Sequence, residues 1–136
     1  DNGARYVWTS STTAVQALQS PDTLTRRSAG VYGGQIRLHL TFPSAYTGML
    51  HLYALDADST SRRETITIDD GSGPRTADIS TDFSQGAWVS APITVAAGGS
   101  VTIAVTRTAG ANAVLSGIFL GGPLPPAVQR TTTTAQ

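Results

Sequence analysis

The sequence contains no cysteine and no lysine, and only 13% of its 136 residues are charged, about half the usual share of roughly 25%. The absence of cysteine excludes disulfides, thiolate metal sites and a cysteine nucleophile. All nine basic residues are arginines, and nine acidic residues bring the formal net charge to zero. A chain without excess positive charge cannot hold a phosphate backbone by counterion release, so we expect no nucleic-acid partner.

Long hydrophobic stretches are also missing. No apolar run approaches the roughly 20 residues needed to cross a bilayer, so we expect no membrane insertion. The sequence begins at Asp1 without an initiator methionine or the regions of a signal peptide, which indicates a mature or excised piece. The sequence has few charged residues but contains 20 threonines and 13 serines. A neutral, hydroxyl-rich surface without thiols favours an extracellular location, secreted or at the cell surface.

The hydrophobic pattern has a period of two wherever it is clear, and no segment has the 3.6-residue period of a long amphipathic helix. The clearest alternation runs over residues 35–42 and is repeated over residues 49–54. We predict that these two strands form a hairpin with Leu40 facing Leu50 in the interior, since a shift of one residue would turn every leucine to solvent.

Further strands follow at regular intervals. A second hairpin is predicted over residues 64–80 and a third between residues 93–95 and 101–105, while the apolar segment 113–120 predicts a central strand covered on both faces. Shorter strands are predicted at residues 5–9, 15–18 and 87–89. About nine short strands at spacings of roughly 10 to 12 residues predict an all-β fold, a two-sheet antiparallel β-sandwich that is jelly-roll-like.

The length corresponds to one domain, which we place at residues 1–122. Residues 123–136 differ in character, because they begin with three prolines within four residues and continue with the four consecutive threonines 131–134. This tail is interpreted either as an extended interdomain linker or as an added strand on the sheet edge of a neighbouring copy.

Two groups of side chains are candidates for metal binding. In the predicted hairpin, His39 and His51 face each other. They are interpreted either as a metal-binding pair, for which a third ligand is missing, or as an ordinary cross-strand pair. Asp56, Asp58 and Asp70 are weak candidates for calcium, which takes roughly six to eight oxygen ligands. The spacing of an EF-hand is missing and Arg62 and Arg63 lie close in sequence, so a structural network of aspartate and arginine is favoured.

Catalytic patterns are absent from the sequence. Glu64 is the sole glutamate, no serine lies in a nucleophile elbow, and the glycine-rich segments open no helix that would bind phosphate. Several aromatic residues, in contrast, stand next to predicted turns, where exposed rings can stack on sugars while charged side chains bind the hydroxyls. Alternatively, the two tryptophans belong to the core or cover a sheet. The predicted ligand contacts are Trp8, Tyr46, Trp88, Asp56, Asp58 and Arg63.

Five segments of the chain, residues 50–63, 67–71, 83–88, 107–112 and 114–120, carry a family resemblance. They resemble a β-sandwich module found repeatedly in large secreted bacterial proteins and alongside glycoside hydrolases, related to galactose-binding-like jelly rolls and carbohydrate-binding modules. The resemblance implies a non-catalytic, ancillary role with sugar binding. Fuller copies of the module begin with a further aromatic and glycine-rich segment, and without that segment a sheet edge or groove is left open.

Two hypotheses of function follow. The first is a non-catalytic extracellular module that binds carbohydrate, a polysaccharide or glycan, or mediates surface attachment. The alternative is a structural subunit of an extracellular filament, in which the C-terminal tail donates a strand to the next copy. A hydrolase is the least favoured reading, and no cofactor other than calcium is expected.

Overall fold

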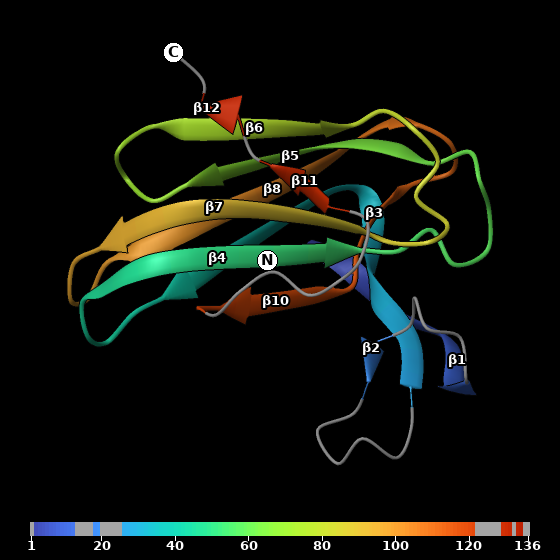
Figure 1. Cartoon of the computed structure of the whole chain (residues 1–136), viewed down its shortest axis with the longest axis horizontal. Helices are drawn as coiled ribbons and strands as arrows, with labels where there is room; N and C mark the ends of the chain where they lie inside the picture. Colours follow the sequence, from blue (N-terminus) through green and yellow to red (C-terminus); the bar gives the residue numbers. More distant parts are fainter. Residues whose placement is uncertain (1, 13–17, 20–25, 122–128, 132, 135–136) are drawn as a thin grey trace.

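The computed structural model describes residues 2–12, 18–19, 26–121, 129–131 and 133–134, and all of the regular structure in these ranges is β-strand. The larger sheet has the order β1-β3-β8-β5-β6-β12, with β2 and β9 also paired to β3, and the smaller sheet has the order β10-β4-β7-β11. Figure 1 shows the smaller sheet lying across the larger one. The predicted all-β, jelly-roll-like sandwich is therefore confirmed. The strands are β1 (Asn2–Thr12), β2 (Leu18–Gln19), β3 (Arg26–Thr41), β4 (Tyr46–Ala54), β5 (Arg63–Asp69), β6 (Pro74–Ile79), β7 (Ala87–Val95), β8 (Ser100–Ala109), β9 (Ala113–Leu115), β10 (Gly117–Leu120), β11 (Gln129–Thr131) and β12 (Thr133–Thr134).

The core lies between the two sheets, and strands such as β5 and β8 contribute alternate residues to it. Along β5 every second residue is buried, and β8 repeats this pattern over its first six residues. Ile66 and Ile103 from the larger sheet and Leu50 and Leu52 from the smaller sheet are each 0% exposed. Because full burial of such a side chain contributes about 1.5–3 kcal/mol, these inward faces hold the two sheets together.

The hairpin predicted over residues 64–80 is confirmed as β5 and β6, which pair antiparallel with Ile66 opposite Ala77. Both of these residues are buried, as the alternation predicts. The turn contains Gly71 at a φ of +99°, a conformation that glycine adopts without the steric cost of a Cβ atom.

The other two predicted hairpins are wrong. Strand β3 pairs with β8 in the larger sheet, and β4 pairs with β7 in the smaller sheet, so the connection from β3 to β4 crosses from one sheet to the other. The segment from β7 to β8 crosses back in the same way. The alternation shows which side chains of a strand face the interior. It does not show whether the next strand in the sequence pairs with that strand in the same sheet or lies across the core in the other sheet.

The predicted histidine pair fails for the same reason. His39 lies opposite Thr102 in the larger sheet, and His51 lies opposite Ser90 in the smaller one. The His51 ring is buried, with its Nδ1 2.8 Å from the Ser90 hydroxyl. The two imidazoles therefore lie in different sheets and do not form a shared metal site.

The segment 113–120 is not one central strand. It divides at Ser116 into β9, which pairs with β3, and β10, which pairs with β4 at the edge of the smaller sheet. Residues of β9 are buried, whereas Phe119 and Leu120 of β10 are 41% and 48% exposed. An apolar run alone does not distinguish a buried strand from an exposed edge.

The described parts of the tail pair with strands of their own chain. Strand β11 pairs parallel with β7, and β12 pairs antiparallel with β6. These pairings give no support to strand donation between copies. The strand predicted at residues 15–18 lies almost wholly outside the described residues, and the division into residues 1–122 and 123–136 stays a prediction.

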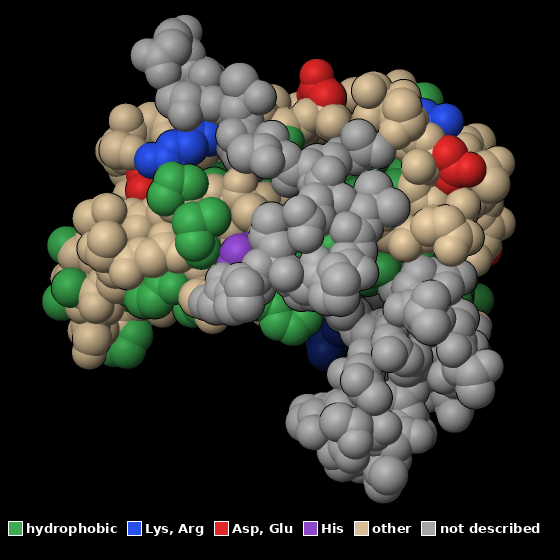
Figure 2. All heavy atoms as spheres, in the orientation of Figure 1, with side chains coloured by type: hydrophobic (Ala, Val, Ile, Leu, Met, Phe, Trp, Pro, Cys, Tyr) green, Lys and Arg blue, Asp and Glu red, His purple; other side chains and the backbone are tan. Residues whose placement is uncertain are grey.

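Within the described ranges there is no helix that is long and apolar enough to cross a membrane. On the face drawn in Figure 2, charged side chains of the described residues are few, and most of the described surface there is uncharged. This agrees with the low charged fraction of the sequence.

Candidate functional site

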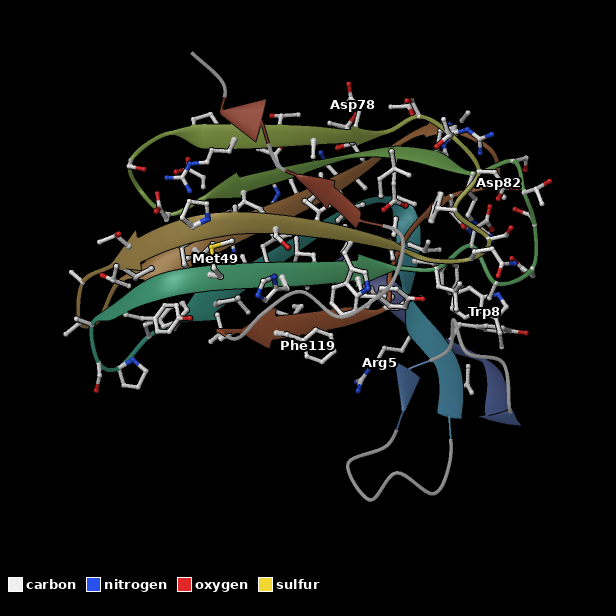
Figure 3. All side chains as sticks on the ribbon, in the orientation of Figure 1. Arg5, Trp8, Met49, Asp78, Asp82 and Phe119 are labelled. Carbon is white, nitrogen blue, oxygen red and sulfur yellow. The ribbon has the colours of Figure 1, made fainter. Side chains whose placement is uncertain are left out.

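A small pocket lies where β1 and β3 meet the loops that join β4 to β5 and β8 to β9. Its volume is about 160 Å³, below the roughly 300–1,000 Å³ of sites that enclose drug-sized ligands, so it suits one small ring. We refer to it as the aromatic–polar pocket. Trp8 marks its position in Figure 3. Of the residues that the structure describes, three aromatic and three polar ones line it: Tyr6, Trp8, Tyr32, Asp58, Arg62 and Asn112.

The aromatic wall comes from two paired strands. Tyr6 and Trp8 stand two residues apart on β1, so their side chains point to the same face, and Tyr32 comes from β3. The Tyr6 ring contacts Trp8 at a centroid distance of 5.3 Å and Tyr32 at 6.2 Å, both edge to face, which is a favoured arrangement for aromatic pairs. Tyr6 remains 52% exposed, so this wall is accessible from solvent.

The polar side of the pocket is organised by one buried guanidinium. Arg62 is 5% exposed, and its Nη1 donates to Asp56 Oδ1 at 2.5 Å and also to Asp58 Oδ1. Its Nε donates to Asn112 Oδ1 at 2.7 Å. Since the donors of a guanidinium have a fixed planar geometry, these bonds hold Asp58 and Asn112 in place at the pocket.

The β8–β9 loop approaches Arg62 closely at Gly110. Gly110 has a φ of +80°, and a Cβ atom added there would lie 2.7 Å from the Arg62 Cα atom. A glycine is therefore required at this position, both for the backbone conformation and for the contact. The close approach brings Asn112 to within hydrogen-bond distance of Arg62.

The two aspartates on Arg62 differ in exposure. Asp56 is 1% exposed and also accepts hydrogen bonds from the Ser59 hydroxyl and the Arg62 backbone N–H. The side chain of Asp58 is 51% exposed at the pocket. Hydrogen bonds from the Arg62 guanidinium and from the Trp8 side chain hold the pKa of Asp58 below its usual value, against a smaller opposing effect of burial. Asp58 is therefore the negative charge that a ligand meets.

Glu64 lies close to this network but does not line the pocket. It is 0% exposed, and its Oε1 accepts a hydrogen bond from the Val114 backbone N–H at 2.8 Å. Its Oε2 has no hydrogen-bond partner among the residues that the structure describes. Burial raises the pKa of Glu64 to about 8, so this carboxyl is largely protonated at neutral pH.

A larger groove of about 640 Å³ borders Tyr6, which also lines the aromatic–polar pocket. It runs between the β1–β3 edge and the segment from β9 to β10, and Val7, Val31 and Ile118 are among its apolar walls. The polar side chains on it, besides that of Tyr6, are Arg5 and Ser116. It therefore lacks the set of hydrogen-bonding groups that the smaller aromatic–polar pocket contains.

The structure brings together half of the predicted ligand contacts. Trp8 and Asp58 line the aromatic–polar pocket, and Asp56 lies directly behind Asp58 on Arg62. Arg63 is half-buried and donates to the Thr60 carbonyl rather than to the pocket.

Tyr46 and Trp88 lie elsewhere. Tyr46 begins β4, stacks on Phe42 at 5.6 Å and donates to the Met49 carbonyl, whereas the pocket lies beyond the other end of that strand. Trp88 is 3% exposed against Tyr53 and Phe119, which agrees with the alternative that it covers a sheet.

The three calcium candidates do not meet. Asp70 follows the end of β5, seven residues long, while Asp56 and Asp58 lie near its beginning. The favoured network is present, because Arg62 pairs with both Asp56 and Asp58. No group of three metal-ligating side chains occurs among the described residues, and calcium binding stays a prediction.

Sequence reasoning missed four pocket residues, namely Tyr6, Tyr32, Arg62 and Asn112. Tyr6 had a usable signal, since it shares a strand face with Trp8. Asn112 had none, because it is separated from Arg62 by 50 positions in the chain.

Comparisons with known proteins find structural similarity at low sequence identity. A family 35 carbohydrate-binding module from an environmental isolate is 20% identical with a TM-score of 0.47, and the match covers 88% of this chain and 82% of that one. An exo-β-1,3-galactanase from Phanerochaete chrysosporium, solved with β-1,3-galactotriose, is 17% identical with a TM-score of 0.46, and this chain spans only 27% of it. No family model matches the sequence, and no curated protein sequence matches it either. The first neighbour is of the class that the sequence motifs resemble, while the β-sandwich assignment is established by the two sheets themselves.

Proposed function

We propose that this domain is a non-catalytic carbohydrate-binding module and that the aromatic–polar pocket is its sugar-binding site. One observation carries the proposal: three aromatic side chains and three fixed polar side chains line the same small pocket. A sugar ring has apolar C–H faces, which stack on aromatic rings, and a rim of hydroxyls, which need hydrogen-bond donors and acceptors. Tyr6 and Trp8 supply the first kind of surface, and Asp58 and Asn112 supply the second.

The charges of the pocket support binding rather than hydrolysis. Glycoside hydrolysis generally needs two carboxyl groups flanking the bond, one of them with a raised pKa so that it can act as an acid. Asp58 is the carboxylate that lines the pocket, and its pKa is lowered. Glu64 has the raised pKa but is fully buried away from the pocket wall.

An extracellular role accords with this site. Polysaccharides and surface glycans are neutral or weakly charged hydroxyl-rich polymers, and a chain with zero net charge and many threonines and serines approaches them without long-range repulsion. Attachment to a glycan-bearing surface would use the same pocket.

The test is binding of the whole chain to a panel of oligosaccharides and insoluble polysaccharides, by calorimetry and by retention. Trp8→Ala should weaken binding by about 10-fold, the equivalent of one lost aromatic contact of about 1.4 kcal/mol. Phe119→Ala is the matched control, because Phe119 is a partly exposed ring at another edge of the molecule (Figure 3). Equal losses in both variants, or no retention on any glycan, would contradict the proposal.

A further inference from the structure

The charges at the aromatic–polar pocket do not cancel. One guanidinium, Arg62, faces two carboxylates, Asp56 and Asp58, which leaves one negative charge. Two other arginines of the described residues stand close to Arg62 in the chain or bond its neighbouring loop, and neither lines the pocket: Arg63 donates to the Thr60 carbonyl and Arg107 to the Gly110 carbonyl. Among the side chains that the structure describes, those at the pocket therefore present a net negative charge to a ligand.

The positive charge is also the less accessible one. Arg62 is 5% exposed, and its Nη1 and Nε already donate to two carboxylates and to Asn112. The Asp58 side chain is 51% exposed. An incoming ligand therefore meets the carboxylate before it meets the guanidinium.

These contacts disfavour an acidic sugar. To pair with the Nη1 or Nε donors of Arg62, the carboxylate of a uronic acid would have to displace Asp58, Asp56 or Asn112. Asp56 is 1% exposed and holds further hydrogen bonds from Ser59 and from the Arg62 backbone, so its displacement would leave a buried charge without its partner. Asp58 would in addition repel the ligand carboxylate.

A protonated amine on a sugar ring would be attracted by the same negative charge that repels the carboxylate of a uronic acid. An ammonium group beside Asp58 forms a charge-assisted hydrogen bond, and the rings of Trp8 and Tyr6 add a cation–π attraction within about 6 Å. We infer that the aromatic–polar pocket selects an amino sugar of the glucosamine or galactosamine type over its neutral and acidic counterparts. This inference rests on the proposed function of the same pocket and adds the chemical class of the ligand.

The experiment compares oligosaccharides of equal length and linkage that differ only in charge. β-1,4-Linked oligomers of glucosamine, N-acetylglucosamine, glucose and glucuronate, and galactosamine paired with galactose, are titrated into the whole chain by calorimetry at low and high salt, at a pH where the amine is protonated. We expect the amine to bind about 10-fold more tightly than its neutral counterpart at low salt, with a smaller ratio at high salt because exposed charges are screened.

Two variants assign the effect. Asp58→Asn should reduce the amine-to-neutral ratio to near one, because the asparagine carries no charge that favours the amine over the neutral sugar. Asp78→Asn removes the same charge from an exposed position on β6, far from Trp8 in Figure 3, and should keep the ratio. If Asp58→Asn disturbs folding, the salt dependence of the unaltered chain still measures the charge contribution.

The outcomes separate the two proposals. Equal or tighter binding of neutral or acidic sugars would overturn the amine preference and leave the proposed function intact. A preference that survives in Asp58→Asn would also overturn it, because the charge would then lie elsewhere. Binding of none of these sugars, and no retention on any glycan, would overturn both.

Discussion

Two clusters of aspartate and arginine lie at opposite ends of β5, and the one at its beginning borders the aromatic–polar pocket. At the beginning of the strand, Arg62 pairs with Asp56 at 2.5 Å and also with Asp58. At its end, Arg75 lies 3.7 Å from Asp70. The two clusters combine the same residue types, so composition alone does not distinguish them.

Their hydrogen-bond partners do distinguish them. Asp70 accepts from the Ser72 hydroxyl, which closes the turn between β5 and β6, and from the Thr94 backbone N–H of β7 at 2.9 Å, so it has hydrogen-bond partners besides its arginine. Asp56 is buried against the Arg62 guanidinium, which also fixes groups beside an aromatic wall. In this chain, acidic loop residues form a candidate site where a buried counter-ion holds them next to accessible rings.

The largest expected effect comes from removing each arginine. Arg62→Ala should lower the free energy of unfolding by about 3–5 kcal/mol, because it leaves the Asp56 carboxylate buried without its charged partner. Arg75→Ala should cost less, about 1 kcal/mol, because Asp70 keeps its hydrogen bonds from Thr94 and Ser72 when the arginine is removed. Urea unfolding of both variants at pH 7 measures the difference. Similar losses would show that the two clusters are equivalent and that the comparison is mistaken.

The pH dependence of stability should have opposite signs at the two ends. Burial raises the pKa of Glu64 from 4.5 to about 8, so the folded state keeps a proton that the unfolded state releases in this range. The free energy of unfolding should therefore fall by about 3 kcal/mol between pH 5 and pH 7, at about 1.4 kcal/mol per pH unit. Glu64→Gln should remove most of this slope, as measured by urea unfolding across the range.

Asp70 provides the contrast. Burial is the largest single influence and raises its pKa, but the combined hydrogen bonds from Ser72 and Thr94 lower it below the ordinary value of 3.8. Its contribution to stability is thus present above that value and is lost as the pH falls below it.

The Glu64 prediction has a clear contrary outcome. A wild-type stability that stays flat from pH 5 to pH 7 would show that Glu64 is ionised in the folded chain.

The inward faces of the strands were predictable from the sequence, but their partners were not. The period of two identified buried residues such as Ile66 on β5 and Ile103 on β8, since each strand presents one face to the core. The same rule could not show that the chain crosses between sheets after β3 and after β7. Both arrangements bury the same side chains, so hydrophobic patterning does not choose between them.

The candidate site was predictable only in part, for a related reason. Trp8 and Asp58 were identified because aromatic and acidic residues next to turns are recognisable types. Tyr46 has the same local signal, but β4 is nine residues long, so its ends lie about 26 Å apart at roughly 3.3 Å per residue. A position beside a turn does not tell at which end of the sandwich that turn lies.

The smallest expected effect separates binding from stability at the two clusters. Asn112→Ala removes a polar group of the aromatic–polar pocket and should weaken sugar binding by about 10-fold, with a loss of about 1–2 kcal/mol in stability from its bond to Arg62. Ser72→Ala removes a comparable bond to Asp70 and should cost about 1 kcal/mol in stability without changing affinity. Calorimetric titration and urea unfolding of both variants give the two quantities. The expected difference in affinity arises because the turn at Ser72 is outside the aromatic–polar pocket, whereas Asn112 lines it. If Ser72→Ala weakens sugar binding as much as Asn112→Ala does, the ligand does not discriminate between the two ends of β5, and the pocket at its beginning is not the sugar-binding site.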